Sequence, residues 1–120
     1  MDRKTARPIS WIKRAEKDFR DFPLTAQQRA ARALTQIAEG DTPDIAKPLL
    51  GFGSGVWELA IKDRSDAFRV VCLLQLGAEI WVVHAFQKKS TQGIATPKHE
   101  IDLIRDRIKR LKELLNGQRR

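Results

Sequence analysis

Hydrophobic residues recur at three- and four-residue intervals over the first forty positions, a spacing typical of amphipathic helices. The first set comprises Trp11, Ile12, Ala15 and Phe19. It predicts a helix that begins near Ser10, whose hydroxyl can accept hydrogen bonds from the first turn, and that ends before Pro23. Thr25 and Gln28 have capping-box spacing, which predicts a second helix that stops at Gly40. A short proline-containing turn would join the two helices as an antiparallel hairpin.

The hydrophobic period changes to two residues at Val56, which indicates strands. In residues 56–62 one face is formed by Trp57, Leu59 and Ile61 and the other by Glu58, Ala60 and Lys62. Residues 67–75 and 79–87 are apolar on nearly both faces, as in central strands that are covered twice. Turns at residues 63–66 and at Gly77 would make these strands antiparallel. The connector 41–55, rich in glycine and proline, would add a short edge strand around Lys47–Leu50.

A last helix is predicted to open at Thr96-Pro97, because proline is favoured at the first helical position, and to end at Gly117. Its apolar seam comprises Ile101, Ile104, Ile108, Leu111 and Leu115. The order of elements predicts an α+β fold, with two N-terminal helices, an antiparallel sheet of three to five strands and a C-terminal helix. Its 120 residues suffice for one modest core, so we expect a single domain over residues 1–120.

Composition adds a strong positive charge to this picture. Lys and Arg outnumber Asp and Glu by 23 to 15, which gives a net charge of +8 and favours an anionic partner: nucleic acid, an acidic protein or an anionic membrane. No segment approaches the ~20 apolar residues of a membrane span, and no secretory signal precedes Pro8. The single cysteine, Cys72, reads as a buried hydrophobe. We therefore expect a cytoplasmic protein, and the spacing of His84, His99 and Cys72 predicts no metal site.

Candidate chemistry gathers at the end of the last predicted strand. His84, Lys88 and Lys89 lie there, and Arg69 interrupts the neighbouring apolar strand. Such groups on a rigid sheet suit the binding and cleavage of a phosphodiester. The lysines could equally be solubilising charges at a strand end. Arg69 could grip a phosphate, or it could form a structural ion pair with Glu58 or Asp66 across the hairpin.

The remaining candidates have weaker patterns. His84 is expected to share a strand face with Ile80, Val82 and Phe86, either as a hydrogen-bonded sheet histidine or as a catalytic group. Glu58 could act as a base or orient Arg69. Lys62 and Arg64 read as solvated charge or as part of a nucleic-acid footprint. Among the aromatic residues, Phe86 is the best candidate for stacking on a base, and we assign Trp57 and Trp81 to packing.

Several motifs together resemble a known family. They are Asp21-Phe22-Pro23, Lys47-Pro48-Leu49, the spaced Gly51, Gly53 and Gly55, Val56-x-Glu58-Leu59, Ala67-Phe68-Arg69-Val70, His84-Ala85-Phe86-Gln87-Lys88-Lys89, Thr96-Pro97 and Ile101-Asp102-Leu103. In this order they resemble the phage-derived, HigB-type branch of the RelE/ParE toxin superfamily. The resemblance spans nearly the whole chain.

The resemblance implies the toxin of a type II toxin–antitoxin pair, a metal-independent and cofactor-free endoribonuclease that cleaves messenger RNA, usually on the ribosome. It implies a helix-turn-helix antitoxin as partner, and operator DNA only through the antitoxin complex. Arg69 then matches the arginine placed against the phosphate, and Lys88-Lys89 match the basic run that ends the last long strand. RelE has lysines where this chain has Glu58 and Ala60, and a C-terminal tyrosine where this chain has no Tyr at all. That leaves His84 as the acid–base candidate.

Two other functions stay open at this point. Within the same fold, ParE-like members poison DNA gyrase and cleave no RNA. The basic rim could also belong to a non-catalytic nucleic-acid-binding or partner-binding module.

Overall fold

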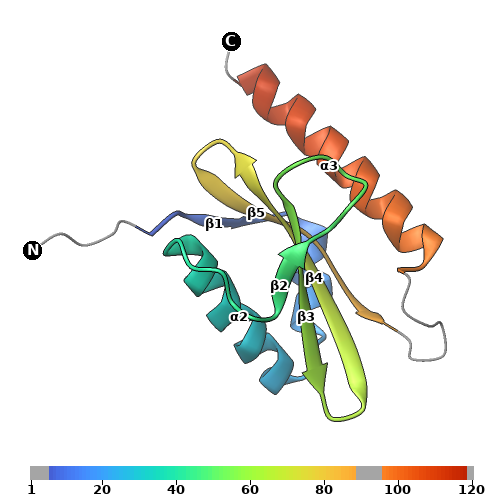
Figure 1. The fold of residues 1–120 in the computed structure, drawn as a ribbon. Coiled ribbons are helices and arrows are strands. Elements are labelled where there is room, and N and C mark those ends of the chain that lie inside the picture. Colours follow the sequence, from blue (N-terminus) through green and yellow to red (C-terminus); the bar gives the residue numbers. More distant parts are fainter. Residues whose placement is uncertain (1–5, 89–95, 119–120) are drawn as a thin grey trace, which may run out of the picture.

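The computed structural model describes residues 6–88 and 96–118 and has an α+β fold, which confirms the predicted class (Figure 1). One five-stranded sheet has the strand order β1-β5-β4-β3-β2. In chain order the elements are β1 (Ile9–Trp11), α1 (Lys13–Arg20), α2 (Leu24–Ala38), β2 (Ala46–Pro48), β3 (Val56–Asp63), β4 (Asp66–Leu76), β5 (Glu79–Lys88) and α3 (Lys98–Gln118). The strands β2 to β5 form an antiparallel meander, and β1 is parallel to β5.

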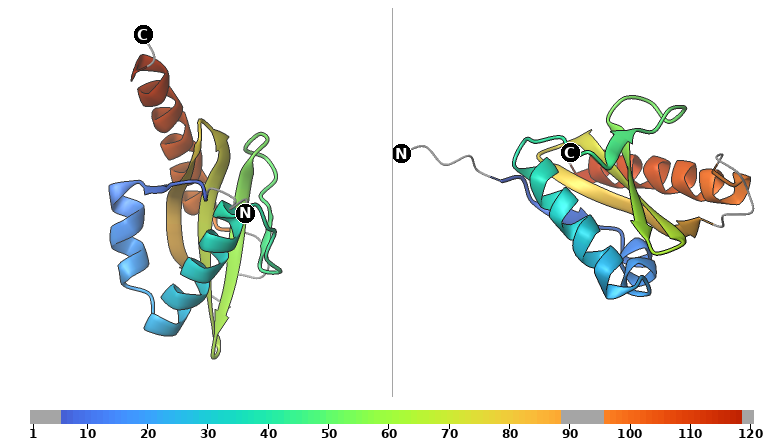
Figure 2. Two further views of the ribbon diagram at one scale, coloured as in Figure 1. Left: turned by 90° about the vertical axis from the view of Figure 1, so that its left-hand side faces the viewer. Right: turned by 60° about the horizontal axis from the view of Figure 1, so that its bottom comes forward.

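Helices cover both faces of the sheet, so each central strand is buried twice (Figure 2). The helices α1 and α2 lie on one face, which we call the α1–α2 face, where their apolar residues pack on Leu59, Ile61, Val70, Cys72, Ile80 and Val82. The helix α3 lies on the other, the α3 face, where Ile104, Ile108 and Leu111 pack on Val56, Val71, Leu73 and Val83. Alternate residues of β3 and β4 therefore enter different cores, as the two-residue period predicts.

Most of the predicted elements are confirmed with small shifts at their ends. Trp57 and Trp81 pack against the two cores, as assigned. Cys72 is fully buried, and burial raises the pKa of its thiol to about 12, in keeping with a packing role. The helix α3 follows Pro97 directly and buries Ile104, Ile108 and Leu111 of the predicted seam, while Ile101 and Leu115 are partly buried. No helix within the described residues is long and apolar enough to cross a membrane.

The prediction for the N-terminal segment is wrong in two respects. Ser10 does not cap a helix: it lies in β1, in register with Trp81 of β5, and α1 begins only at Lys13 after an Ile12 cap that makes no side-chain hydrogen bond. Thr25 does not cap α2 either. The cap is Pro23, and the Thr25 hydroxyl donates instead to Asp63 Oδ1 at 2.8 Å, which ties α2 to the β3–β4 turn.

A β-bulge in β5 overturns two of the predicted neighbours of His84, Ile80 and Val82, whereas Phe86 shares its face as predicted. Val71 of β4 pairs with His84, but the next residue, Cys72, pairs with Val82, so Val83 has no partner of its own. An inserted residue shifts the side-chain alternation by one position. Val82 consequently enters the α1–α2 core, while His84 is turned toward α3, where it contacts Glu100.

Candidate functional site

Apart from Arg64, which lies in the β3–β4 turn, the predicted site residues that the structure describes lie in three rows across the α3 face. In register from β3 through β4 to β5, these rows are Glu58–Val71–His84, Ala60–Arg69–Phe86 and Lys62–Ala67–Lys88. Residues directly opposite one another on antiparallel strands have Cβ atoms about 4.5–5.5 Å apart. The small side chains Ala60 and Ala67 lie between the charged groups. Lys89 lies outside the described residues.

Arg69 is held by an ion pair with Glu58. Its Nε lies 3.5 Å from Glu58 Oε1, and the two side chains are 16% and 6% exposed. Of the two structural partners considered from the sequence, Glu58 is therefore the one found. The contact engages Nε, and within the described residues no hydrogen bond is recorded for the two terminal nitrogens of the guanidinium. Glu58 thus fixes Arg69 without using the fork that would grip a phosphate.

Positive charge exceeds negative charge around this pair. Lys88 is 8% exposed, and its pKa is lowered, first by burial and then by the repulsion of Arg69, with Lys47 adding to it and Glu58 opposing it. Lys47 is in register with Glu58 on β2. Lys47, Arg69 and Lys88 therefore lie near one carboxylate, and positive formal charges outnumber negative ones among these four residues, which favours an anionic ligand. We call Lys47, Glu58, Arg69 and Lys88 the basic cluster.

His84 lies on the same face, in a row next to Arg69, but both of its ring nitrogens are engaged. Arg107 Nη1 donates to His84 Nδ1 at 2.7 Å and to the Val83 carbonyl at 3.1 Å. A guanidinium has no acceptor, so Nδ1 must be unprotonated and Nε2 must carry the proton. Nε2–H then donates to Glu100 Oε1 at 2.6 Å. Burial, first, and the Arg107 charge lower the pKa of His84, against the opposing effect of Glu100, which favours this neutral form.

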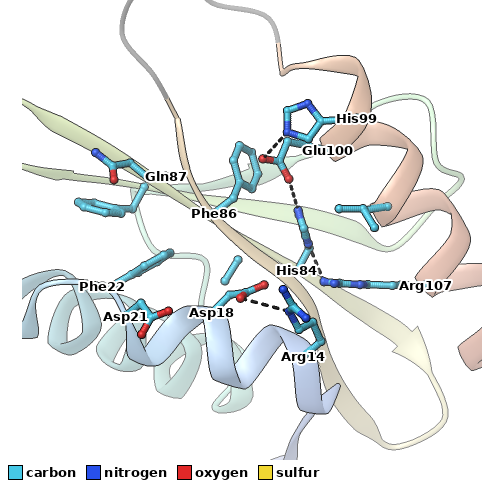
Figure 3. A pocket seen from close by; sticks show the side chains of 13 residues that line it. Arg14, Asp18, Asp21, Phe22, His84, Phe86, Gln87, His99, Glu100 and Arg107 are labelled. Atoms are coloured by element: carbon cyan, nitrogen blue, oxygen red, sulfur yellow. Dashed lines mark hydrogen bonds and ion pairs between the residues drawn. The ribbon is translucent and has the colours of Figure 1, made fainter.

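A cavity of about 570 Å³ opens beside His84, between α1 and the start of α3 (Figure 3). β1 pairs with β5 only at Ile80–Val82, so the outer edge of β5 beyond these residues is not covered by a described strand. The walls combine Phe22, Phe68 and Phe86 with charged residues of both signs from α1 and α3. Phe86 is 7% exposed, and its ring centroid lies 5.2 Å from that of His84. Such a cavity suits a ligand that is both planar and polar.

Sequence reasoning missed Glu100 and Arg107 and set His99 aside. Glu100 Oε2 also lies 3.2 Å from His99 Nε2, so this carboxylate joins the buried and the exposed histidine. One signal was available, since positions 100 and 107 fall on the same helical stripe as Ile104 and Leu111 of the buried seam. A charged residue on an inward stripe implies an interior partner.

The two predicted RNA-binding cations lie away from the basic cluster. Lys62 is exposed near the end of β3, separated from Lys88 by Ala67. Arg64 is exposed in the β3–β4 turn, with a φ of 59°. Both lie toward the tip of the hairpin. Within residues 6–88 and 96–118, no three His, Cys, Asp or Glu side chains are grouped as metal ligands.

Comparisons with known proteins give the fold and the family. The structure is similar to that of an arginine-to-alanine double mutant of the E. coli toxin RelE in the free state (TM-score 0.55, 19% identity, 73% of this chain and 90% of that one). It is also similar to the isolated E. coli RelE toxin (0.55, 17%, 84% and 98%) and to the toxin–antitoxin complex RelBE2 of Mycobacterium tuberculosis (0.50, 11%, 73% and 98%). No curated protein matches the sequence.

At these identities the solved structures establish a RelE-like fold and nothing finer. The family is established by the sequence itself, because the family model described as "Phage derived protein Gp49-like (DUF891)" matches residues 17–109, well over half of the chain. The chain therefore belongs to the phage-derived Gp49-like protein family and has the RelE fold.

Proposed function

We propose that this protein is the toxin of a type II toxin–antitoxin pair of the HigB type, and that it is a metal-independent endoribonuclease that cleaves messenger RNA on the ribosome. Its family and its fold support the class, since the similar structures are those of RelE toxins and of a toxin–antitoxin complex. The net charge of +8 suits a polyanionic substrate.

The observation that carries the proposal is the Arg69–Glu58 ion pair, which fixes a guanidinium on the sheet close to Lys47 and Lys88. In the proposed reaction the RNA 2′-hydroxyl attacks the adjacent phosphorus, the P–O5′ bond breaks, and the products are a 2′,3′-cyclic phosphate and a 5′-hydroxyl. Negative charge accumulates on the phosphate oxygens as the pentacoordinate transition state forms. The terminal nitrogens of Arg69 would donate to these oxygens, the positive charge of Lys88 would add to their stabilisation, and Glu58 holds Arg69 in place. Lys89, the next residue in the sequence, would add a further positive charge for the RNA.

The other predicted residues find roles around this centre. Phe86, opposite Arg69 on β5, would stack on a base next to the bound phosphate. Lys62 and Arg64 would contact the RNA backbone toward the hairpin tip. A helix-turn-helix antitoxin would neutralise the toxin, and the pair would bind operator DNA through the antitoxin.

Induced expression of wild-type protein and of Arg69→Gln, followed by primer extension on cellular messages, tests this proposal. We choose glutamine because alanine would leave the Glu58 carboxylate buried without a partner, a change that costs about 3–5 kcal/mol and could unfold the protein. Arg110→Gln is a matched control, since Arg110 is 79% exposed on α3 and pairs only with Asp106 among the described residues.

The proposal predicts codon-periodic cleavage by wild type and Arg110→Gln, and its loss in Arg69→Gln at equal abundance. Growth arrest with gyrase-linked DNA breaks and intact messages would instead identify a ParE-like gyrase poison. Growth without either lesion would leave a non-catalytic binding module.

A further inference from the structure

A chain of four polar side chains runs from the interior of the protein to its surface. Arg107 donates to His84 Nδ1 at 2.7 Å, His84 Nε2 lies 2.6 Å from Glu100 Oε1, and Glu100 Oε2 lies 3.2 Å from His99 Nε2 (Figure 3). From His84 outward, the exposed fraction of the side chain rises from 3% for His84 to 14% for Glu100 and 72% for His99. Arg107, at the other end of the chain, is half-buried. The chain therefore ends in one solvent-accessible imidazole that is anchored from below.

The protons of this chain are fixed in one direction. Because Arg107 can only donate, His84 must donate through Nε2, and Glu100 must accept as a carboxylate. The second oxygen of Glu100 forms an ion-pair contact with His99, whose Nε2 lies 3.2 Å away. With the His99 proton on Nε2, toward this carboxylate, Nδ1 is the acceptor at the outer end of the chain. A carboxylate that orients an imidazole and stabilises its protonated form is the arrangement by which a histidine becomes a general base.

Phe86 lies between the outer end of the chain and the basic cluster, whose four residues are not among those that line the cavity. His99, Glu100 and Phe86 line the same cavity, and Phe86 is the direct cross-strand neighbour of Arg69. A nucleotide stacked on Phe86 would present its phosphate to Arg69 and its ribose toward α3. We propose that His99 is the general base of the endoribonuclease, and that Glu100 and His84 are its positioning residues. This inference rests on the proposed function.

In the resulting step, His99 Nδ1 takes the proton from the 2′-hydroxyl while the 2′-oxygen forms its bond to phosphorus. The P–O5′ bond breaks, and the leaving 5′-oxygen takes a proton from solvent. The Glu100 carboxylate stabilises the imidazolium that forms, and His84, held neutral by Arg107, keeps Glu100 in position. The proton of the 2′-hydroxyl goes to His99 and the proton of the 5′-hydroxyl comes from solvent, so the step needs no reactant besides RNA and water.

The test is single-turnover cleavage of a defined message on programmed ribosomes by the wild type, His99→Ala and Glu100→Gln, across a pH series. General-base removal lowers rates by about 10²–10⁴-fold, so we expect a loss of that size in His99→Ala. Added imidazole should restore part of this rate, because the truncated side chain leaves an accessible space at an exposed position. Lys98→Ala is the matched control, as Lys98 is 87% exposed and pairs with Asp102.

The pH series separates catalysis from structure. The wild-type rate should fall at acidic pH as His99 becomes protonated, and this limb should disappear in His99→Ala. Glu100→Gln should lower the rate, because the carboxylate that faces the imidazolium formed in the step is lost. The other charged or titratable groups around the cavity are Arg14 and Asp18 of α1, Asp21 just after it, His84 of β5, and Arg107 of α3. They are unchanged in all three proteins.

The outcomes for the two proposals differ. Cleavage by His99→Ala at the wild-type rate, or a loss that imidazole does not restore and that leaves the pH profile unchanged, would overturn the assignment of His99 while the ribonuclease stands. Absence of cleavage by the wild-type protein would overturn the proposed function, and the assignment would fall with it.

Discussion

Burial of a neutral His84 should make the fold sensitive to acid. Its folded-state pKa is lowered, chiefly by burial, from an ordinary value of 6.5. Below about pH 6.5 the unfolded chain therefore binds a proton at His84, whereas burial disfavours protonation of this ring in the folded protein. Because stability rises with pH wherever the unfolded state binds more protons, this contribution is complete above pH 6.5 and is lost as the pH falls toward the folded-state pKa.

The informative variant is His84→Gln, which keeps an amide donor and acceptor at the site but does not titrate. One proton changes the free energy of unfolding by at most ~1.4 kcal/mol per pH unit. With a urea m-value of about 2 kcal/mol per M, the wild-type midpoint should fall relative to the variant by up to ~0.7 M per pH unit below pH 6.5.

Urea unfolding followed by far-UV circular dichroism between pH 5 and 8 measures both midpoints, and the carboxylates shared by the two proteins cancel in the difference. A difference that stays constant over this range would show that His84 is not buried as a neutral ring. A difference that grows in the opposite direction would show that Glu100 holds it protonated.

Other predictions concern neighbouring features. Arg107→Met should lower the free energy of unfolding by about 2–4 kcal/mol in urea titrations, since it removes two hydrogen bonds from a charged donor to buried acceptors. Gly55→Ala should reduce the thermal midpoint more than Gly51→Ala does. Both glycines have a positive φ (81° and 95°), which strains alanine by about 1–3 kcal/mol, but only at Gly55 would the new Cβ meet another side chain, at 2.8 Å. Lys88→Ala with Lys89→Ala should reduce the slope of log K against log salt for single-stranded RNA by about 1.4, and an unchanged slope would assign both lysines to solubility.

The strands were predictable because their hydrophobic period is local. In β3 the alternation of Trp57, Leu59 and Ile61 with Glu58, Ala60 and Lys62 indicated a strand. It also indicated which residues share its more apolar face, and the structure confirms both. The strand β1 could not be found in this way. Residues 9–12 fit a helical face equally well, and their extended conformation depends on pairing with Ile80–Val82, about seventy residues later in the chain.

The site was predictable in its residue types but not in its connections. The sequence indicated that Arg69, His84 and Lys88 gather on one sheet, and they do lie on one face. The bulge at Val83 has no clear sequence signal, yet it decides that His84 meets α3 and not the α1–α2 core. Glu100 and Arg107 are 16 and 23 residues from His84, so their contacts with it depend on how α3 docks on the sheet.

The chemistry of the new RNA ends tests the central claim most directly. Purified protein is added to ribosomes programmed with a defined message, and the fragments are probed for their terminal groups. Attack by the 2′-hydroxyl, aided by the basic cluster, predicts 2′,3′-cyclic phosphate and 5′-hydroxyl ends that are absent with Arg69→Gln. Fragments with 3′-hydroxyl and 5′-phosphate ends, or an intact message, would contradict it.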